Sequence, residues 1–450
     1  MYPESDYKEA YTMTFPEKAK LHLWSDIHEM SKNPGRFAKN PGADFTRARK
    51  LDFEDLMRLL VTMQSGTTGH ELLKYFDHST DTISNSGFLQ QRNKLLPEAL
   101  KQLLYLFNSH FPFETYDGIF RLLAVDGSGF NIARNPNDTT TFCPPSGSSK
   151  KGFNSIYVTS LFDLLSKRYL DCVIQPERLK SEFRAICNLA DRYNDGGIPV
   201  FIGDRGVSCY NFYAHAIERG IFFVVRAKEI NTKRLLGVKS LPDSIDTVTD
   251  LILTRSNAKT KYLHPELSER YRYICREVTF DYLPIDSSDE YPLSLRVVRI
   301  KADNGTYVNL VTNIHDTEVS IETLNIWYRL RWGIETSFRD FKHTIGAIHF
   351  HSKKVVFIEQ EIWARMILFN FCSIIALHVI VAKKMSKYVY QVNFAMAMKI
   401  CHHFIRLRGR DPPIDVVGLI GSYILPIRPN RTFERNKRFQ LPTSFWYRLS

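Results

Sequence analysis

Between residues 119 and 227 the chain alternates short apolar runs with amphipathic segments, and this pattern limits the possible folds most. The predicted strands, in chain order, are 119–125, 155–162, 168–174, 198–203 and 221–227. Amphipathic helices are predicted at 177–193 and 210–219, between the later strands. This order predicts an α/β fold in which helices flank a mixed sheet.

The periodicity changes outside this segment. Residues 1–115 have mostly helical pattern, residues 229–316 are rich in strand formers, and helical pattern returns at 317–384. Within the last of these, the apolar stretch 362–382 is long enough to span a membrane. It is interrupted by arginine, asparagine and histidine, so we interpret it as a buried core helix and expect no membrane partner.

The positive charge of the chain is local. The formal net charge is +12, and residues 341–450 alone carry that whole excess. Local basic surfaces usually bind phosphate groups, so we expect a polyanionic partner. The seven cysteines are scattered without a CxxC pair, which indicates a reducing compartment.

Two aspartates stand out by their position. Asp126 directly follows the apolar run 119–125, and Asp204 directly follows the run 198–203. Groups at the carboxyl ends of strands in an open α/β sheet face the crevice where ligands bind. Two such carboxylates could hold hard divalent cations, although each aspartate could instead only cap a turn.

A third acid belongs to a helical pattern at 326–343. Tyr328, Arg331, Glu335 and Lys342 lie at offsets of 0, 3, 7 and 14 residues. On a continuous helix these offsets place all four side chains within about 60° of one face. The alternative is that the Arg331–Glu335 spacing only stabilises the helix by an i,i+4 ion pair.

Together these residues resemble the signature of the insertion-sequence-4 family of bacterial transposases. The matching motifs are Asp126-Gly-Ser, Asp204-Arg-Gly and Tyr328-x2-Arg331-x3-Glu335-x6-Lys342. The resemblance covers most of the chain and is least specific in 1–80 and 385–450. It implies an RNase H-like core, made by 116–228 and 317–384 and interrupted by the β-rich insertion 229–316. A helical DNA-binding region at 1–115 would precede this core, and a basic region at 385–450 would follow it.

The resemblance also implies roles for individual residues. Asp126, Asp204 and Glu335 would be the catalytic triad and would hold two Mg²⁺ ions, for which Mn²⁺ can substitute. Tyr328, Arg331 and Lys342 would grip phosphates near the cut. Charge and proximity to these motifs suggest further DNA contacts at Arg205, Trp332, Lys353 and Lys354.

The implied function is a DNA transposase that cuts at insertion-sequence ends and transfers the freed strands into target DNA. It would act on double-stranded DNA as a homodimer in the bacterial cytoplasm, at the nucleoid. Two alternatives are a metal-dependent DNA nuclease without strand transfer and a transposase-derived DNA-binding protein. Hairpin-forming relatives stack a flipped base on a tryptophan in the insertion, and residues 229–316 contain none. Either a tyrosine or phenylalanine replaces it, or the hairpin route does not apply.

Overall fold

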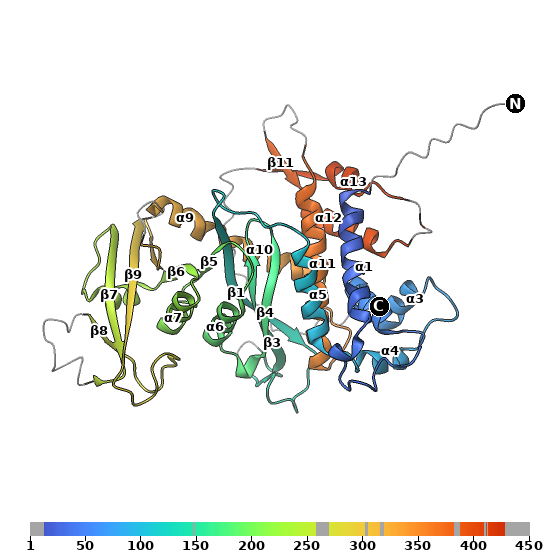
Figure 1. The fold of residues 1–450 in the computed structure, drawn as a ribbon, viewed down its shortest axis with the longest axis horizontal. Coiled ribbons are helices and arrows are strands. Elements are labelled where there is room, and N and C mark those ends of the chain that lie inside the picture. The colour runs from blue at the N-terminus through green and yellow to red at the C-terminus, as the bar shows by residue number, and fades with distance from the viewer. Residues whose placement is uncertain are drawn as a thin grey trace. The chain divides into compact units, whose positions relative to one another are not determined.

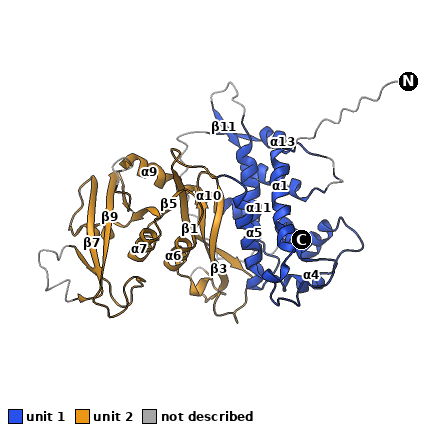
Figure 2. Ribbon diagram, in the orientation of Figure 1, with its two compact units in different colours: residues 1–112, 339–441, 445–450 blue, residues 113–338, 442–444 orange. Residues whose placement is uncertain are grey.

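The computed structural model describes residues 13–146, 149–257, 270–301, 305–315, 319–381, 388–408, 411 and 413–427 (Figure 1). The chain forms two compact units (Figure 2). Unit 1 contains residues 1–112, 339–441 and 445–450, and unit 2 contains residues 113–338 and 442–444. The basic tail 428–450 lies outside the described residues, and the boundaries of the five predicted regions stay predictions.

Unit 1 is built from helices around one long apolar helix. Its helices are α1 (Phe15–Ser31), α2 (Phe53–Thr62), α3 (Thr68–Tyr75), α4 (Asn85–Arg92), α5 (Pro97–Ser109), α11 (Val355–His378), α12 (Phe394–Arg406) and α13 (Val416–Ser422). A two-stranded sheet of β11 (Val389–Val392) and β12 (Ile424–Ile427) adjoins them in sequence. Helix α11 packs against α1, α2, α5 and α12.

Among the described residues, α11 is the one helix whose length and composition would allow it to cross a membrane. In the structure 89% of its most apolar 18-residue window is buried inside the protein. A helix with apolar residues all round is expected in the core of a large domain. The predicted buried core helix is therefore present, with bounds that begin before and end before the stretch 362–382.

Charged side chains are buried in unit 1 as one network. Glu361 accepts hydrogen bonds from Arg92 at 3.1 Å and from Arg365 at 3.3 Å, and its carboxylate lies 3.0 Å from Nδ1 of His351. Arg365 also donates to the carbonyl of Ile345 at 3.0 Å, which connects the segment before α11 to that helix. Burial alone would raise the pKa of Glu361, but His351 and the two arginines hold it far below its usual range.

We expect Glu361→Gln to lower the free energy of unfolding of unit 1 by about 3–5 kcal/mol, because both arginines would lose their buried counter-charge. Denaturant unfolding at neutral pH measures this change. A carboxylate with a lowered pKa contributes stability above its usual pKa and loses it as pH falls through the folded-state value. The difference between wild type and variant should therefore shrink only in strong acid.

Glu359→Gln is the matched control on the same helix. Burial raises the pKa of Glu359, and the charge of Glu98 adds to this effect. Removing the charge of Glu359 should therefore leave stability unchanged or increase it. Equal losses in the two variants would show that the network does not act through the charge of Glu361.

Unit 2 contains a mixed sheet that is ten-stranded among the described residues. Its strands are β1 (Phe120–Ile132), β2 (Phe142–Cys143), β3 (Phe153–Asp163), β4 (Arg168–Pro176), β5 (Ile198–Gly203), β6 (Phe222–Ala227), β7 (Ile245–Thr254), β8 (Tyr271–Tyr273), β9 (Glu290–Lys301) and β10 (Tyr307–Thr312). The strand order is β2-β3-β1-β5-β6-β10-β9-β7-β8, and β4 also pairs with β3. Its helices are α6 (Glu182–Arg192), α7 (Tyr210–Glu218), α8 (Glu229–Leu236), α9 (Ile321–Leu330) and the first part of α10 (Trp332–His343).

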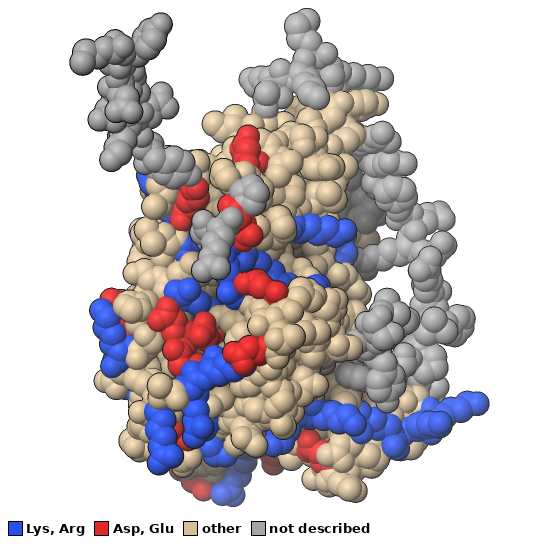
Figure 3. Space-filling model, turned by 90° about the vertical axis from the view of Figure 1, so that its right-hand side faces the viewer, with Lys and Arg blue, Asp and Glu red and all other residues tan. Residues whose placement is uncertain are grey.

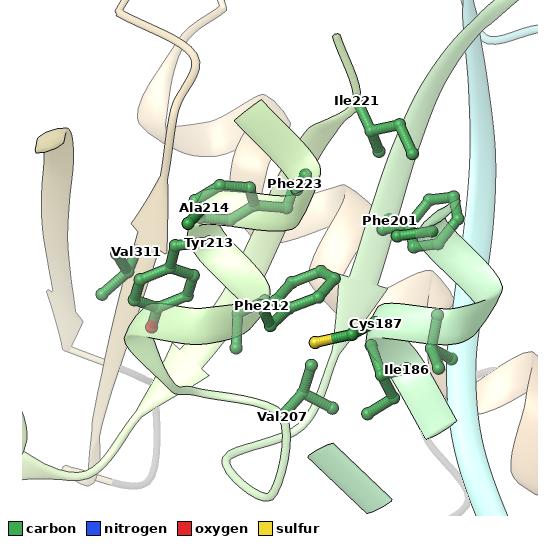
Figure 4. Packing of buried hydrophobic residues seen from close by; sticks show 14 of the residues in the cluster. Ile186, Cys187, Phe201, Val207, Phe212, Tyr213, Ala214, Ile221, Phe223 and Val311 are labelled. Carbon is green, nitrogen blue, oxygen red and sulfur yellow. The ribbon is translucent and has the colours of Figure 1, made fainter. Parts of the chain in front are cut away.

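The central strands β1, β5 and β6 run parallel, and α6 and α7 pack over one face of them. Figure 4 shows Phe201 of β5 and Phe223 of β6 against Phe212 and Tyr213 of α7. The rings of Tyr213 and Phe223 stack at a centroid distance of 4.8 Å. Side chains alternate between the faces of a strand, so the residues between these core positions point to the other face. Helix α9 packs on β5 and β6 and buries Trp327 against Phe120, with ring centroids 5.0 Å apart.

Four local predictions differ from the structure. Strand β1 continues to Ile132 instead of stopping before Asp126, because its antiparallel partner β3 pairs with it that far. The strand formers of 229–316 also predict a strand over 271–282, but β8 is only three residues long there and turns follow it. The strands of the insertion continue the central sheet, since β10 pairs with β6. The continuous helix expected over 326–343 is divided at Arg331 into α9 and α10, and the weak helix former Gly333 is the second residue of α10.

Candidate active site

The parallel strands bring three charged side chains to one level of the sheet. Val125 is paired with Gly203, and Gly203 is paired with Val225. The next residues along these strands are Asp126, Asp204 and Arg226. Val125 and Val225 belong to the apolar core that faces α6 and α7, and a Cβ atom on Gly203 would meet Val207 of the same core. The side chains that follow these three positions therefore start from the opposite face of the sheet.

Helices α9 and α10 supply further polar side chains to this level. The hydroxyl of Tyr328 donates to Oδ1 of Asp204 at 3.0 Å. Arg331, at the junction of the two helices, donates to Oε1 of Glu335 at 2.9 Å. The charge of Arg331 acts on both Asp126 and Asp204, and the charge of Glu335 acts on Asp126. The three predicted acids are thus brought together with Tyr328 and Arg331.

Asp126 carries its negative charge at a cost. The pKa of Asp126 is raised to about 6, mainly by burial and in smaller part by the nearby carboxylates of Glu335 and Asp204. The Gly127 N–H, which donates to Oδ1 of Asp126 at 2.8 Å, and the charge of Arg331 only partly offset these effects. A cation beside Asp126 would relieve this penalty.

Asp204 is stabilised as an anion in the same structure. Burial alone would raise the pKa of Asp204, but the Arg205 N–H and the Tyr328 hydroxyl donate to the carboxylate. The charges of Arg331 and Arg226 add to their effect, and the net result is a lowered pKa. The two aspartates therefore differ in their electrostatics although they lie at one level of the sheet.

Arg331 is a buried cation with spare hydrogen-bonding capacity. Its guanidinium is paired with Glu335, and its centre lies 5.5 Å from the ring of Tyr328. Its Nε is buried and has no hydrogen-bond partner among the described residues. A buried N–H without a partner is costly, so this position is suited to an anionic oxygen.

The other predicted DNA contacts are distributed over both units. Arg205 is exposed in the turn after β5, and Trp332 is 49% exposed at the start of α10. Lys342, Lys353 and Lys354 belong to unit 1. Lys353 and Lys354 are exposed, whereas burial lowers the pKa of Lys342 to about 8.

Arg226 is a candidate that the sequence analysis missed. It occupies the same place on β6 that the two aspartates occupy on β1 and β5, and its charge acts on Asp204 and Tyr328. Arg226 lies inside the predicted strand 221–227 instead of directly after it, so a pattern of polar residues that follow apolar runs does not indicate it. The signal in the sequence is a single charged residue within an otherwise apolar strand.

Most described aromatic rings of the insertion pack within unit 2. Tyr282 and Tyr291 contact each other with ring centroids 5.5 Å apart, and Tyr291 donates to Glu218 at 2.8 Å. Tyr307 donates to Asp243 at 2.5 Å. Tyr273 is 45% exposed, and Tyr262 lies outside the described residues.

The model of the transposase DDE domain matches residues 118–371, which is more than half of the chain. The chain belongs to the transposase DDE domain family. It is therefore a DDE transposase, a polynucleotidyl transferase, and the predicted α/β fold with an RNase H-like core is confirmed. No curated protein matches the chain. Among solved structures it is similar to the cryo-EM structure of the piggyBac transposase synaptic complex with hairpin DNA, with 12% identity and a TM-score of 0.42, over 94% of this chain and 88% of that one.

DDE transposases generally use divalent metal ions. In the part of the chain that the structure describes, no group of three or more His, Cys, Asp or Glu side chains is close enough to hold a metal ion. Glu335 is engaged by Arg331, which leaves Asp126 and Asp204 as the two carboxylates of the strand level. Carboxylate oxygens are the ligands that hard divalent cations prefer, so this donor set fits such an ion.

The opposite electrostatics of the two aspartates give a stability test in metal-free buffer. At about pH 8 we expect Asp126→Asn to raise the free energy of unfolding of the DDE domain by about 2 kcal/mol, because a charge with a raised pKa is lost. Asp204→Asn should lower stability, since its ionised form is stabilised. Thermal unfolding measures both changes.

The pH dependence has a definite sign. The penalty of Asp126 develops as pH rises from its ordinary pKa of 3.8 to about 6 and is constant above that. The stabilisation by Asp126→Asn should therefore be absent near pH 4 and complete at pH 8. A stabilisation that is the same at both values would exclude the carboxylate charge as its cause.

Proposed function

We propose that this DDE transposase is of the insertion-sequence-4 type and acts on the ends of an insertion sequence. It would cut the DNA strands at those ends and join the freed 3′ ends to target DNA. The observation that supports this most is the shared level of Asp126 and Asp204, approached by Tyr328 and the Arg331–Glu335 pair. These are the residues of the family motif, with the spacing of that motif.

In this proposal Asp126, Asp204 and Glu335 would hold two Mg²⁺ ions, with Mn²⁺ as a possible substitute. Glu335 would have to leave its ion pair with Arg331 to do so, since no three acids of the described residues are close enough to hold a metal ion. When bound, the metal would activate a water or 3′-hydroxyl nucleophile and neutralise charge on the leaving oxygen. Tyr328 would keep the carboxylate of Asp204 oriented through their hydrogen bond. Hard divalent cations prefer carboxylate oxygens as ligands, which agrees with a site made of aspartate and glutamate instead of histidine or cysteine.

The cations around these acids would bind the DNA backbone. Arg331 has a buried Nε without a partner, and we assign this donor to a phosphate oxygen close to the cut. Arg226 would hold an adjacent phosphate from the third strand of the same level. Further DNA contacts would come from both units. In unit 2 these are Arg205 and the exposed ring of Trp332, and in unit 1 they are Lys342, Lys353 and Lys354.

A basic groove in unit 1 supports a further DNA contact. Arg47, Arg49 and Lys94 line a hollow of about 480 Å³, and Lys94 lies 5.9 Å from the ring centre of Phe45. Its one acid, Asp52, caps α2 by accepting from the Asp55 N–H at 2.8 Å. Figure 3 shows cationic side chains among anionic ones over one face of the molecule. Because no single charge covers this face, we expect DNA phosphates to contact local basic grooves.

We further propose that the enzyme works as a homodimer holding two DNA ends, in the bacterial cytoplasm at the nucleoid. A dimer would let each active site act on the end bound by the partner. The basic tail 428–450 would add phosphate contacts.

The test uses labelled DNA from the inverted repeats that flank the gene, Mg²⁺ and a supercoiled target. Integrated product supports transposition, nicks alone indicate a nuclease, and a shifted but intact band indicates a DNA-binding protein. We expect Asp126→Asn, Asp204→Asn and Glu335→Gln each to reduce cleavage by about 1,000-fold or more while DNA binding is retained. Glu322→Gln, which changes an exposed acid at the start of α9, is the control. Normal cleavage by any triad variant would remove that residue from the site.

A salt titration tests the groove of unit 1. We expect the double variant Arg47→Ala, Arg49→Ala to lower the slope of log affinity against log salt by about 2, one for each lost phosphate contact. Lys32→Ala is the control, because Lys32 belongs to unit 1 but does not line the groove and is already paired with Glu29. An unchanged slope in the double variant would mean that the groove does not contact DNA.

A further inference from the structure

On the face of β1 opposite to Asp126, the next two positions are glycines and carry no side chain. Gly127 and Gly129 both start from the face covered by α6, and Tyr157 of β3 lies over the first of them. A Cβ atom added to Gly127 would be 2.3 Å from Cε1 of Tyr157, which is closer than carbon atoms can approach. The ring of Tyr157 therefore rests directly on the backbone of Gly127. That peptide also supplies the N–H that donates to Asp126.

The hydroxyl of Tyr157 reaches the second aspartate segment through a glutamate. It donates to Oε1 of Glu182, in the first turn of α6. The other oxygen of Glu182 is 3.5 Å from the position that a Cβ atom would take on Gly206. Gly206 directly follows Arg205, whose N–H donates to Asp204. The Tyr157–Glu182 hydrogen bond thus lies between the backbone beside Asp126 and the turn beside Asp204.

The surroundings keep this hydrogen bond in one state. Burial raises the pKa of Tyr157, and the charges of Glu182 and Asp126 raise it further, so the phenol stays a proton donor. The ammonium group of Lys180 lies 4.1 Å from the centre of the ring and is paired with Glu177 at 2.7 Å. The ring is therefore held by a glycine backbone and a cation.

We propose that Tyr157 and Glu182 are positioning residues for the two aspartates of the site, acting from the opposite face of the sheet. This inference rests on the proposed function of Asp126 and Asp204. Site geometries must be held to within about 0.5 Å, and the loss of groups that orient metal ligands typically costs about 10–100-fold in metal affinity or activity. The pair packs beside the two backbone segments whose N–H groups donate to the carboxylates.

The experiment compares Tyr157→Phe with Tyr193→Phe in the full chain. Tyr193→Phe is the matched control, because it also removes a hydrogen-bonded hydroxyl. The Tyr193 hydroxyl donates to the carbonyl of Gly196, away from the aspartate level. Two quantities are measured: the Mg²⁺ concentration that gives half of the thermal stabilisation without DNA, and the single-turnover rate of nicking of end DNA. We expect Tyr157→Phe to raise the first and lower the second by about 10-fold, with Tyr193→Phe unchanged in both.

Glu182 and the glycines give independent variants. Glu182→Gln keeps an oxygen that accepts from Tyr157, so its metal requirement should stay near that of wild type, whereas Glu182→Ala should behave like Tyr157→Phe. Gly127→Ala should impair metal binding because its Cβ displaces the ring. Gly129→Ala should be tolerated, since its Cβ would meet Ser155 Oγ only at 3.6 Å.

The outcomes separate this inference from the proposed function. A metal response that changes in Tyr157→Phe, with a wild type that cuts no DNA, would support the positioning role and contradict the DNA chemistry. No thermal response of wild type to Mg²⁺, or the same metal requirement in Tyr157→Phe as in Tyr193→Phe, would overturn the positioning role. Loss of metal binding in Glu182→Gln would overturn it too, because Glu182 would then be a direct ligand.

Discussion

The in-register parallel pairing of β1, β5 and β6 is the constraint on which the rest of the site depends. Because Val125, Gly203 and Val225 lie side by side, the residues that directly follow them are brought to one level of the sheet. A shift of one residue in either strand pair would turn a charged side chain toward the apolar face covered by α6 and α7. The packing of Phe201, Phe212 and Phe223 on that face therefore fixes the register and, with it, the chemistry on the other face.

The electrostatics of this level explain why its two aspartates are not equivalent. Asp204 receives donors from the Arg205 backbone and from Tyr328, while Asp126 has one backbone donor and two carboxylates nearby. Arg331 offsets part of the negative charge and binds Glu335 in the same structure. The site thus combines a deficit of positive charge at Asp126 with a donor that has no partner among the described residues at Arg331, which suits cations beside the acids and an anionic oxygen beside Arg331.

The sequence predicted the parts of this site that depend on local pattern. A polar residue directly after an apolar run identified Asp126 and Asp204, and helical spacing brought Tyr328, Arg331 and Glu335 together although α9 and α10 are separate helices. What the sequence could not predict depends on pairing between distant segments. The continuation of β1 to Ile132 requires β3, and the contact of Tyr157 with Gly127 requires the β1–β3 register. The register of β1 against β3 is not encoded in the pattern of either strand alone.

Packing also decides which aromatic side chains are exposed enough to contact DNA. The insertion lacks tryptophan, and composition alone offers several tyrosines as substitutes. In the structure Tyr282 and Tyr291 fill the space between the sheet and α7, and Tyr307 packs on Arg299 with 3.9 Å between its ring centre and the guanidinium. A ring that closes an apolar core cannot leave it to stack on a base without exposing that core to water, at a cost of about 2–3 kcal/mol. Base stacking returns about 1–3 kcal/mol, so core packing and stacking compete for the same ring. Among the described aromatic residues discussed for this role, only Tyr273 and Trp332 are exposed enough to avoid that competition.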